Sequence, residues 1–188
     1  MGNEGLTIWT IGHSNKLFSN FLSLLRSQQI EFLADVRRFP GSRRYPHFNQ
    51  ESLEKALGEE KIQYVHFPEL GGKRATRHDS RNMGWQNLSF RGYADHMETP
   101  EFQDGLAQLK QFAGPNRTAI MCAEVLWWQC HRALISDILK AQGARVLHIL
   151  GPNKVEEHPF TSPARIVNGN LTYPPEPELQ GQLQLLKT

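Results

Sequence analysis

Two cysteines and a histidine–arginine pair are the residues of this chain best suited to do chemistry. Cys122 ends a short apolar segment, and Cys130 follows eight positions later, directly before His131 and Arg132. A helix is expected to begin at about Cys130, and both a helix start and nearby cations stabilise a thiolate. Cys130 is therefore predicted to be the more reactive thiol, either as a nucleophile or as a metal ligand.

The same segment contains the ligands for a transition-metal site. Cys122, Cys130 and His131 supply two sulfur atoms and one imidazole nitrogen. Their spacing differs from that of ordinary zinc motifs, in which paired ligands lie roughly two to four residues apart. A metal is thus one alternative beside an inert, buried Cys122 and a structural Cys130. Glu124 would serve as a general acid or base, or would pair with an arginine.

Other polar side chains follow three further apolar segments, each of which is predicted to be a strand. The carboxyl ends of parallel strands meet at one edge of a sheet, and ligands bind there in open α/β sheets. One shared site is therefore expected. The alternatives are Asp35 as a loop cap, a backbone hydrogen bond for His13, and a plain turn at Gly71-Gly72. Asp35 is assigned to this site as a catalytic residue, and the residues assigned to ligand binding are His13, Ser14, Asn15, Arg37, Gly71 and Gly72.

Basic residues are clustered, although the formal net charge is only +2. One cluster extends from Arg37 to Arg44 and another from Lys73 to Arg81. Such clusters are often solvated surface, and the competing interpretation is a face that binds phosphate, carboxylate or a nucleic-acid backbone. On the second interpretation Arg37 and Arg43 position an anion, and Arg132 is a further ligand-binding residue.

Five short apolar or β-branched segments bounded by turn residues are predicted strands, and helical patterns lie between them. A long loop is expected between Gly71 and Asn87, where glycines and basic residues show little periodicity. The helices are expected to begin at Ser19, Asn49, Thr99 and about Cys130, the last of them ending near Ala141. The predicted strands are Leu6–Ile11, Glu31–Val36, Gln63–Phe67, Thr118–Cys122 and Arg145–Leu150.

Strands that alternate with helices predict an α/β fold. We expect a single three-layer domain with a mostly parallel sheet of about five strands flanked by helices. This domain is expected to cover residues 1–188, with a core at about 6–151. The tail at 152–188, rich in proline and glycine, is expected to wrap the core. The chain length suits one domain of this kind.

The composition is that of a soluble globular protein, with 39% hydrophobic and 21% charged residues. No segment has the length of a transmembrane helix, and the first residues lack the basic and apolar regions of a secretory signal. The two cysteines are too few for a disulfide framework and are expected to remain thiols in a reducing compartment. The expected location is the cytoplasm, with no membrane partner.

An ordered series of motifs, which includes both cysteine segments, resembles the domain-of-unknown-function 488 family. The resemblance covers roughly residues 6–175 and implies that Cys122 and Cys130 are important. The chain departs from the family pattern at Val125–Gln129, where the family has a more polar loop that contains proline. A looser similarity of layout is to rhodanese-like domains, although their compact cysteine cradle is absent after Cys122. The motifs are Thr10–Asn15, Asp35–Arg37, Pro40, Ser42-Arg43, Pro46, Phe48-Asn49, Leu70–Gly72, Tyr93-Ala94, Cys122–Glu124, Cys130–Arg132 and His148-Ile149.

These features together favour an intracellular enzyme whose cysteine, histidine and arginine site acts on an anionic ligand that bears phosphate, such as a nucleotide or nucleic acid. One rival hypothesis is a non-catalytic module that binds nucleic acid or a partner protein, and whose affinity for nucleic acid would fall steeply with salt. Another is a thiol redox sensor or metal-binding domain. A transition metal is the one cofactor suggested, and no oligomeric state is predicted.

Overall fold

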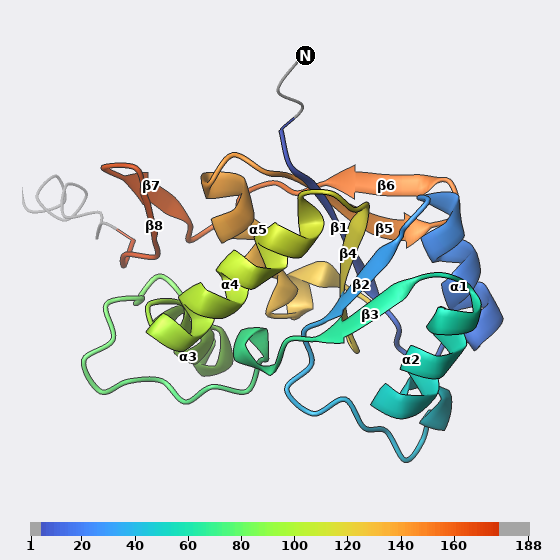
Figure 1. The fold of residues 1–188 in the computed structure, drawn as a ribbon. Helices are drawn as coiled ribbons and strands as arrows, with labels where there is room; N and C mark the ends of the chain where they lie inside the picture. The colour runs from blue at the N-terminus through green and yellow to red at the C-terminus, as the bar shows by residue number, and fades with distance from the viewer. Residues whose placement is uncertain (1–4, 177–188) are drawn as a thin grey trace, which may run out of the picture.

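A six-stranded sheet forms the centre of the protein in the computed structural model, which describes residues 5–176 (Figure 1). Its strands are β1 (Thr7–Gly12), β2 (Phe32–Asp35), β3 (Gln63–His66), β4 (Thr118–Cys122), β5 (Arg145–Gly151) and β6 (Lys154–Glu157). They lie in the order β3-β2-β4-β1-β5-β6, and all neighbours are parallel except β5 and β6. The first five strands match the predicted segments to within one residue at either end.

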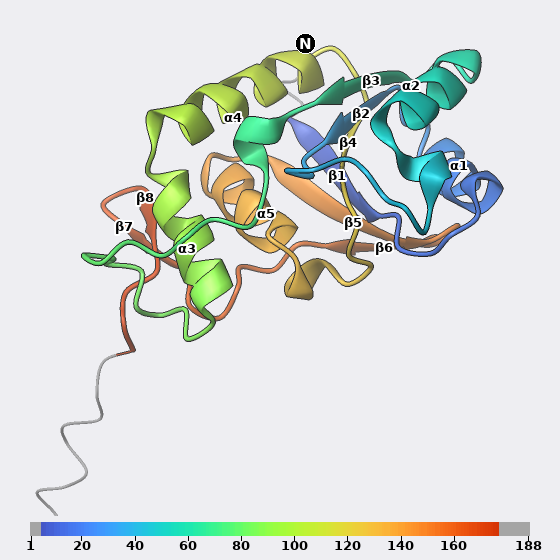
Figure 2. The same ribbon diagram turned by 90° about the horizontal axis from the view of Figure 1, so that it is seen from below.

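Helices cover both faces of the sheet and complete the three layers that the sequence predicts (Figures 1 and 2). Phe21 and Leu53 belong to the apolar cluster on one face, and Phe102 and Leu134 belong to the cluster on the other. No helix within residues 5–176 combines the length and apolarity needed to cross a bilayer. The helices are α1 (Phe18–Ser27), α2 (Gln50–Glu59), α3 (Leu88–Met97), α4 (Pro100–Ala113) and α5 (Arg132–Ala141), with short 3-10 helices η1 (Pro46–Phe48), η2 (Pro68–Leu70) and η3 (Trp127–Gln129).

The helix starts agree only in part with the capping residues that the sequence predicts. Thr99 caps α4 as expected, because its hydroxyl oxygen accepts a hydrogen bond from the backbone N–H of Phe102. The expected cap at Ser19 is wrong: α1 begins one residue earlier, at Phe18, and Leu17 occupies the capping position. The predicted start at Cys130 is also early, since α5 begins at Arg132.

Helix α3 is an element that the sequence patterns do not predict. Asn87 caps it with a side-chain oxygen that accepts from the N–H groups of Ser89 and Phe90. Its buried side chains include Tyr93 and Met97, which pack against the same core cluster as α4 and α5. The segment that leads into it, 71–87, has no helix or strand, as expected.

The segment after Pro152 contributes a strand to the sheet, which raises the expected number of about five to six. Strand β6 pairs antiparallel with β5, and a separate hairpin forms from β7 (Arg165–Val167) and β8 (Asn170–Thr172). The side chains of His158 and Tyr173 are buried in the core. The part of the expected tail at 177–188 lies outside the described residues.

The connections of the sheet create a crevice at the carboxyl end of β4. The chain leaves β1 and β2 towards α1 and α2 on one face, whereas it leaves β4 towards α5 on the other. Where the connections of neighbouring parallel strands leave toward opposite faces of a sheet, the loops diverge and leave room for a ligand. The register places Gly12 opposite Cys122 and Asp35 opposite Met121, so the ends of all three strands border this crevice.

Candidate functional site

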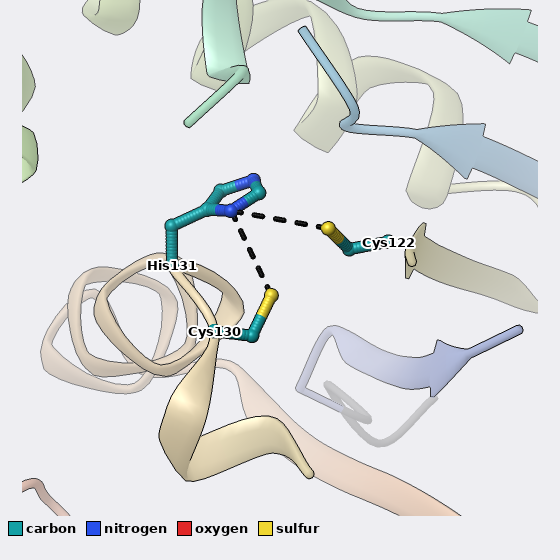
Figure 3. A group of neighbouring side chains, drawn as sticks. All are labelled: Cys122, Cys130 and His131. Atoms are coloured by element: carbon teal, nitrogen blue, oxygen red, sulfur yellow. Dashed lines mark hydrogen bonds between the residues drawn. The ribbon is translucent and has the colours of Figure 1, made fainter. Parts of the chain in front are cut away.

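Cys122, Cys130 and His131 converge at the carboxyl end of β4 (Figure 3). The Cys130 Sγ atom lies 3.6 Å from His131 Nδ1, and the Cys122 Sγ atom lies 3.9 Å from the same nitrogen. All three atoms lie within 4.8 Å of one another. Zinc bonds of ~2.3 Å to sulfur and ~2.0 Å to nitrogen, at tetrahedral angles, separate sulfur and nitrogen ligands by about 3.6 Å. The two sulfur–nitrogen distances are therefore close to those between ligands of a tetrahedral site.

The His131 ring is held in the orientation that such a site needs. Its Nε2 donates a hydrogen bond to the backbone oxygen of Val36 over 2.9 Å, and a carbonyl can only accept. The hydrogen at Nε2 is thereby fixed, and Nδ1 points at the two sulfur atoms. A metal-bound histidine characteristically donates its other N–H to a carbonyl or carboxylate in this way.

Gly72 gives the His131 ring its space. A Cβ atom at Gly72 would lie 2.8 Å from His131 Nδ1, which no ordinary contact allows. At Gly71 a Cβ would lie 2.7 Å from the Arg38 Cα atom, because the two backbones approach closely. The predicted glycine pair thus permits close packing around the candidate metal ligands, in addition to turning the chain.

Gly72→Ala is expected to reduce the affinity of the three-residue cluster for zinc by about 10–100-fold. This is the usual range for substitutions at residues that support a metal ligand without binding the metal themselves. The measurement is competition with a chromophoric chelator. Gly41→Ala is the matched control, since Gly41 also lines the cavity of the site but a Cβ atom added there would meet nothing within 4 Å. Equal affinities for the two variants would show that His131 tolerates the displacement.

The two thiols have opposite electrostatic environments. A hydrogen bond to Cys130 and burial raise the pKa of Cys122 well above its ordinary value. Burial also acts to raise the pKa of Cys130, but the hydrogen bond with Cys122, His131 and the Arg132 charge outweigh it and lower that pKa. Cys130 is therefore the more readily ionised sulfur, as the sequence predicts, although its neighbours provide this effect and it lies two residues before α5.

Asp35 and Arg37 form a buried ion pair that supports the strand ends beside the cysteines. Asp35 accepts hydrogen bonds from the backbone N–H, Nε and Nη2 of Arg37 and from the Tyr64 hydroxyl. Arg37 Nη1 donates to Nε2 of His13, whose Nδ1 donates to the Ser14 oxygen. Burial lowers the pKa of His13 to about 4, so this ring is neutral near pH 7. The guanidinium of Arg37 is thus largely occupied by protein partners.

A cavity of about 560 Å³ opens over the sulfur atoms. Arg38 and Lys73 line it, and among residues 5–176 neither side chain forms an ion pair. Glu124 is exposed and lines the same cavity. The cavity therefore combines two cations without ion-pair partners in that range, one carboxylate and the candidate metal ligands. Other lining residues are Phe39, Asn87, Ser89, Phe90 and Gln129.

The structure brings most of the sequence-predicted residues together, but in different roles. Cys122, Cys130, His131, Glu124, Arg37 and Gly72 line the cavity. Arg43 is exposed and does not line the cavity, whereas Arg38 and Lys73 do. Residues outside the cavity lining that border the site through backbone or buried contacts are His13, Ser14, Asp35, Gly71 and Arg132, whereas Asn15 is exposed.

Several residues of the site are not assigned to it by the sequence patterns. Asn87 and Ser89 line the cavity at the start of α3, the helix that those patterns miss. A signal for it exists, because Asn87 precedes apolar residues at helical spacing, Phe90, Tyr93 and Met97. Tyr64, which binds Asp35 from β3, carries no distinguishing signal.

A family model described as "Domain of unknown function DUF488" matches residues 18–139. This range contains both cysteines, His131, Asp35, Arg37 and the glycine pair, and it leaves out β1 and everything after α5. Comparisons with curated proteins and with solved structures found no match. The matched range covers more than half of the chain, and the protein belongs to the DUF488 family.

Proposed function

We propose that this protein is a metal-dependent enzyme in which Cys122, Cys130 and His131 hold one zinc-type ion. The observation that carries the proposal is the convergence of two sulfur atoms on a nitrogen whose ring is already oriented by Val36. Three protein ligands with a fourth position left for water or substrate are the usual arrangement of catalytic zinc, and two cysteines with one histidine are a known set. Here the cavity supplies the space for that fourth ligand.

The proposed substrate carries an anionic group. Arg38 and Lys73 lie at the cavity without an acidic partner among the described residues, and Arg38 is further fixed by donating to the Lys73 backbone oxygen over 2.5 Å. A guanidinium and an ammonium together favour phosphate or carboxylate groups. The cavity volume lies in the range of small-molecule sites, which favours a phosphate-bearing metabolite or single nucleotide over a long polymer.

Glu124 is the proton acceptor in this proposal. A zinc-type ion supplies an activated water near pH 7. Glu124, which lines the same cavity, would accept a proton from such a water as it attacks the substrate and would return that proton to the leaving group. Arg38 and Lys73, which line the same cavity, would hold the anionic group. The reaction class is thus hydrolytic.

Protein purified without chelator is expected to contain about one equivalent of zinc per chain. Cys122→Ser and Cys130→Ser should each reduce zinc affinity by more than ~100-fold, because each removes a proposed ligand. Substitutions of residues that only support a ligand reduce affinity by up to ~100-fold. Elemental analysis and absorption of the cobalt-substituted protein measure this. His78→Ala is the control, because His78 is exposed and does not line the cavity.

A metal-free protein with unchanged activity would overturn the metal proposal and favour the second candidate, a thiolate nucleophile at Cys130. The opposite pKa directions of the two cysteines are the observation behind that candidate. On that candidate, a thiol reagent at neutral pH would modify the Cys122→Ser variant, which retains Cys130, faster than the Cys130→Ser variant. Slow reaction of both variants in the metal-free protein would exclude it.

Binding of inorganic phosphate is expected to weaken by about tenfold in Arg38→Ala and in Lys73→Ala, because each loses a charge-assisted hydrogen bond worth about 1.5 kcal/mol or more. Titration calorimetry at two salt concentrations measures the change. Arg43→Ala is the matched control from the same basic cluster, since Arg43 lies outside the cavity lining. An equal loss in all three variants would indicate attraction by net charge alone.

A further inference from the structure

A chain of buried hydrogen bonds lies behind the cysteine site, between α5 and the sheet, and it begins and ends on α5. We call Asp137, His158, His148, Thr10 and Arg132 the buried relay. Each of the five is at most 1% exposed. The successive contacts are His158 Nε2 to Asp137 Oδ1 at 2.9 Å, His148 Nε2 to His158 Nδ1 at 2.9 Å, Thr10 Oγ1 to His148 Nδ1 at 2.7 Å and Arg132 Nη1 to Thr10 Oγ1 at 3.3 Å.

One arrangement of donors and acceptors satisfies every hydrogen bond of the relay. The Asp137 carboxylate accepts, so His158 carries a hydrogen at Nε2, and in this arrangement its Nδ1 accepts from His148 Nε2. His148 Nδ1 then accepts from the Thr10 hydroxyl. From the other end, Arg132 can only donate, and the Thr10 oxygen is free to accept from it. Both ends are compatible with this arrangement, in which each link is satisfied.

The relay holds the loop between the two cysteines at two points. Arg132 Nη2 donates to the backbone oxygens of Glu124 and Val125, directly after Cys122. The Trp127 ring stacks on His148, with centroids 4.3 Å apart and planes 7° from parallel. The backbone oxygen of Trp127 in turn accepts from the N–H of Cys130 over 3.2 Å. Movement of Arg132 would therefore shift the Cys122 end of this loop, and movement of His148 would shift the Cys130 end.

Arg132 depends on the relay for its counter-charge. No carboxylate lies within ion-pair distance of its guanidinium in the part of the chain that the structure describes. A buried cation without compensation is strongly unfavourable. The Asp137 carboxylate, which also accepts from Thr161 and Tyr173, is connected to Arg132 through three neutral groups. Polarised chains of this kind transmit electrostatic stabilisation better than isolated pairs do.

We propose that the buried relay is a positioning network that sets the geometry of the Cys122–Cys130 loop and so the metal affinity of the site. The proposal rests on the proposed function for the metal and on the contacts above for the loop. Thr10, His148 and His158 lie outside the range that the family model matches. Residues on both sides of the range that the family model matches thus help to hold the loop between the two cysteines.

Thr10→Val is the most specific test, because it removes one hydroxyl from the middle of the relay and keeps the shape of the side chain. Zinc affinity should fall by about 10–100-fold, as for other groups outside the coordination shell. Hydrogen exchange of the backbone amides at 123–130 should become faster. Thr10→Ser, which retains the hydroxyl, should restore both properties. Thr118→Val is the matched control, since Thr118 is equally buried but lies at the opposite end of β4 from Cys122.

Wild-type zinc affinity and wild-type exchange in Thr10→Val would overturn the relay proposal, and so would an equal effect of Thr118→Val. If the wild-type protein binds no zinc, the proposed function fails, and the exchange rates alone then decide the positioning role. Should Thr10→Val fail to fold, His158→Gln and His158→Leu provide a second pair. Glutamine can both donate and accept as His158 does, so only the leucine variant should loosen the loop.

Discussion

Asp35→Ala is expected to lower the free energy of unfolding by about 3–5 kcal/mol, the usual cost of removing one partner from a buried ion pair. The Asp35 side chain is fully buried, and that of Arg37 is 6% exposed. Burial acts to lower the pKa of Arg37, but the hydrogen bonds and charge of Asp35 raise it above the ordinary value. Without Asp35, a buried guanidinium and the Tyr64 hydroxyl lose their acceptor. Urea denaturation at pH 7 measures the change.

A double substitution separates the loss of the ion pair from the burial of an unpaired charge. Arg37→Met in the Asp35→Ala background removes the stranded cation and should recover a substantial part of the lost stability. Asp35 does not line the cavity, so its expected effect is on folding and on the support of His13. If Asp35→Ala folded normally and lost only activity, the carboxylate would have the catalytic role that the sequence alone suggests.

The architecture is accessible from the sequence because the central strands are nearly continuous apolar segments. Strand β4, Thr118–Cys122, is buried at every position, which follows from helices packing on both faces of a parallel sheet. Once such a sheet is assumed, the ends of β1, β2 and β4 must share one edge. The meeting of His13, Asp35 and Cys122 requires no further information.

The roles of individual cations cannot be predicted in this way. Arg37 and Arg38 are neighbours, but one side chain points to Asp35 in the interior and the other lies exposed at the cavity. This choice depends on the path of the backbone after β2, which local sequence does not determine. Lys73 reaches the cavity because the 71–87 segment folds back across the strand ends, and its backbone oxygen binds Arg38.

The buried relay is equally hidden in the sequence, because its members come from distant parts of the chain. His148 stands out only as part of a family-like motif, and His158 lies in a segment expected to be a surface tail. Their contact requires the turn that pairs β6 with β5. Strand β6 gives no clear apolar pattern in the sequence, because every one of its residues is exposed. Long-range pairing of short polar strands is the kind of structure that patterning does not reveal.

Acidification is expected to destabilise the protein steeply between pH 6.5 and about pH 4.5, the range below the ordinary imidazole pKa. Burial lowers the pKa of His13 to about 4 and that of His148 to about 2, from the ordinary histidine value of 6.5. Below pH 6.5 these two histidines therefore bind protons in the unfolded chain but remain neutral in the folded protein. The free energy of unfolding consequently falls as the pH falls. Each histidine contributes about 1.4 kcal/mol per pH unit, so the two together remove roughly 5 kcal/mol over this range.

The pH dependence of unfolding in urea distinguishes this linkage from a simple loss of packing. His148→Gln loses stability at every pH because Thr10 and His158 lose an ideal partner. Its slope over the same acidic range should nevertheless be smaller than that of the wild type by about 1.4 kcal/mol per pH unit, since one buried imidazole no longer resists protonation. A parallel slope in the variant would mean that His148 is protonated in the folded protein. The Thr10 oxygen would then accept from His148 Nδ1 as well as from Arg132, and His158 Nδ1 would accept from His148 Nε2.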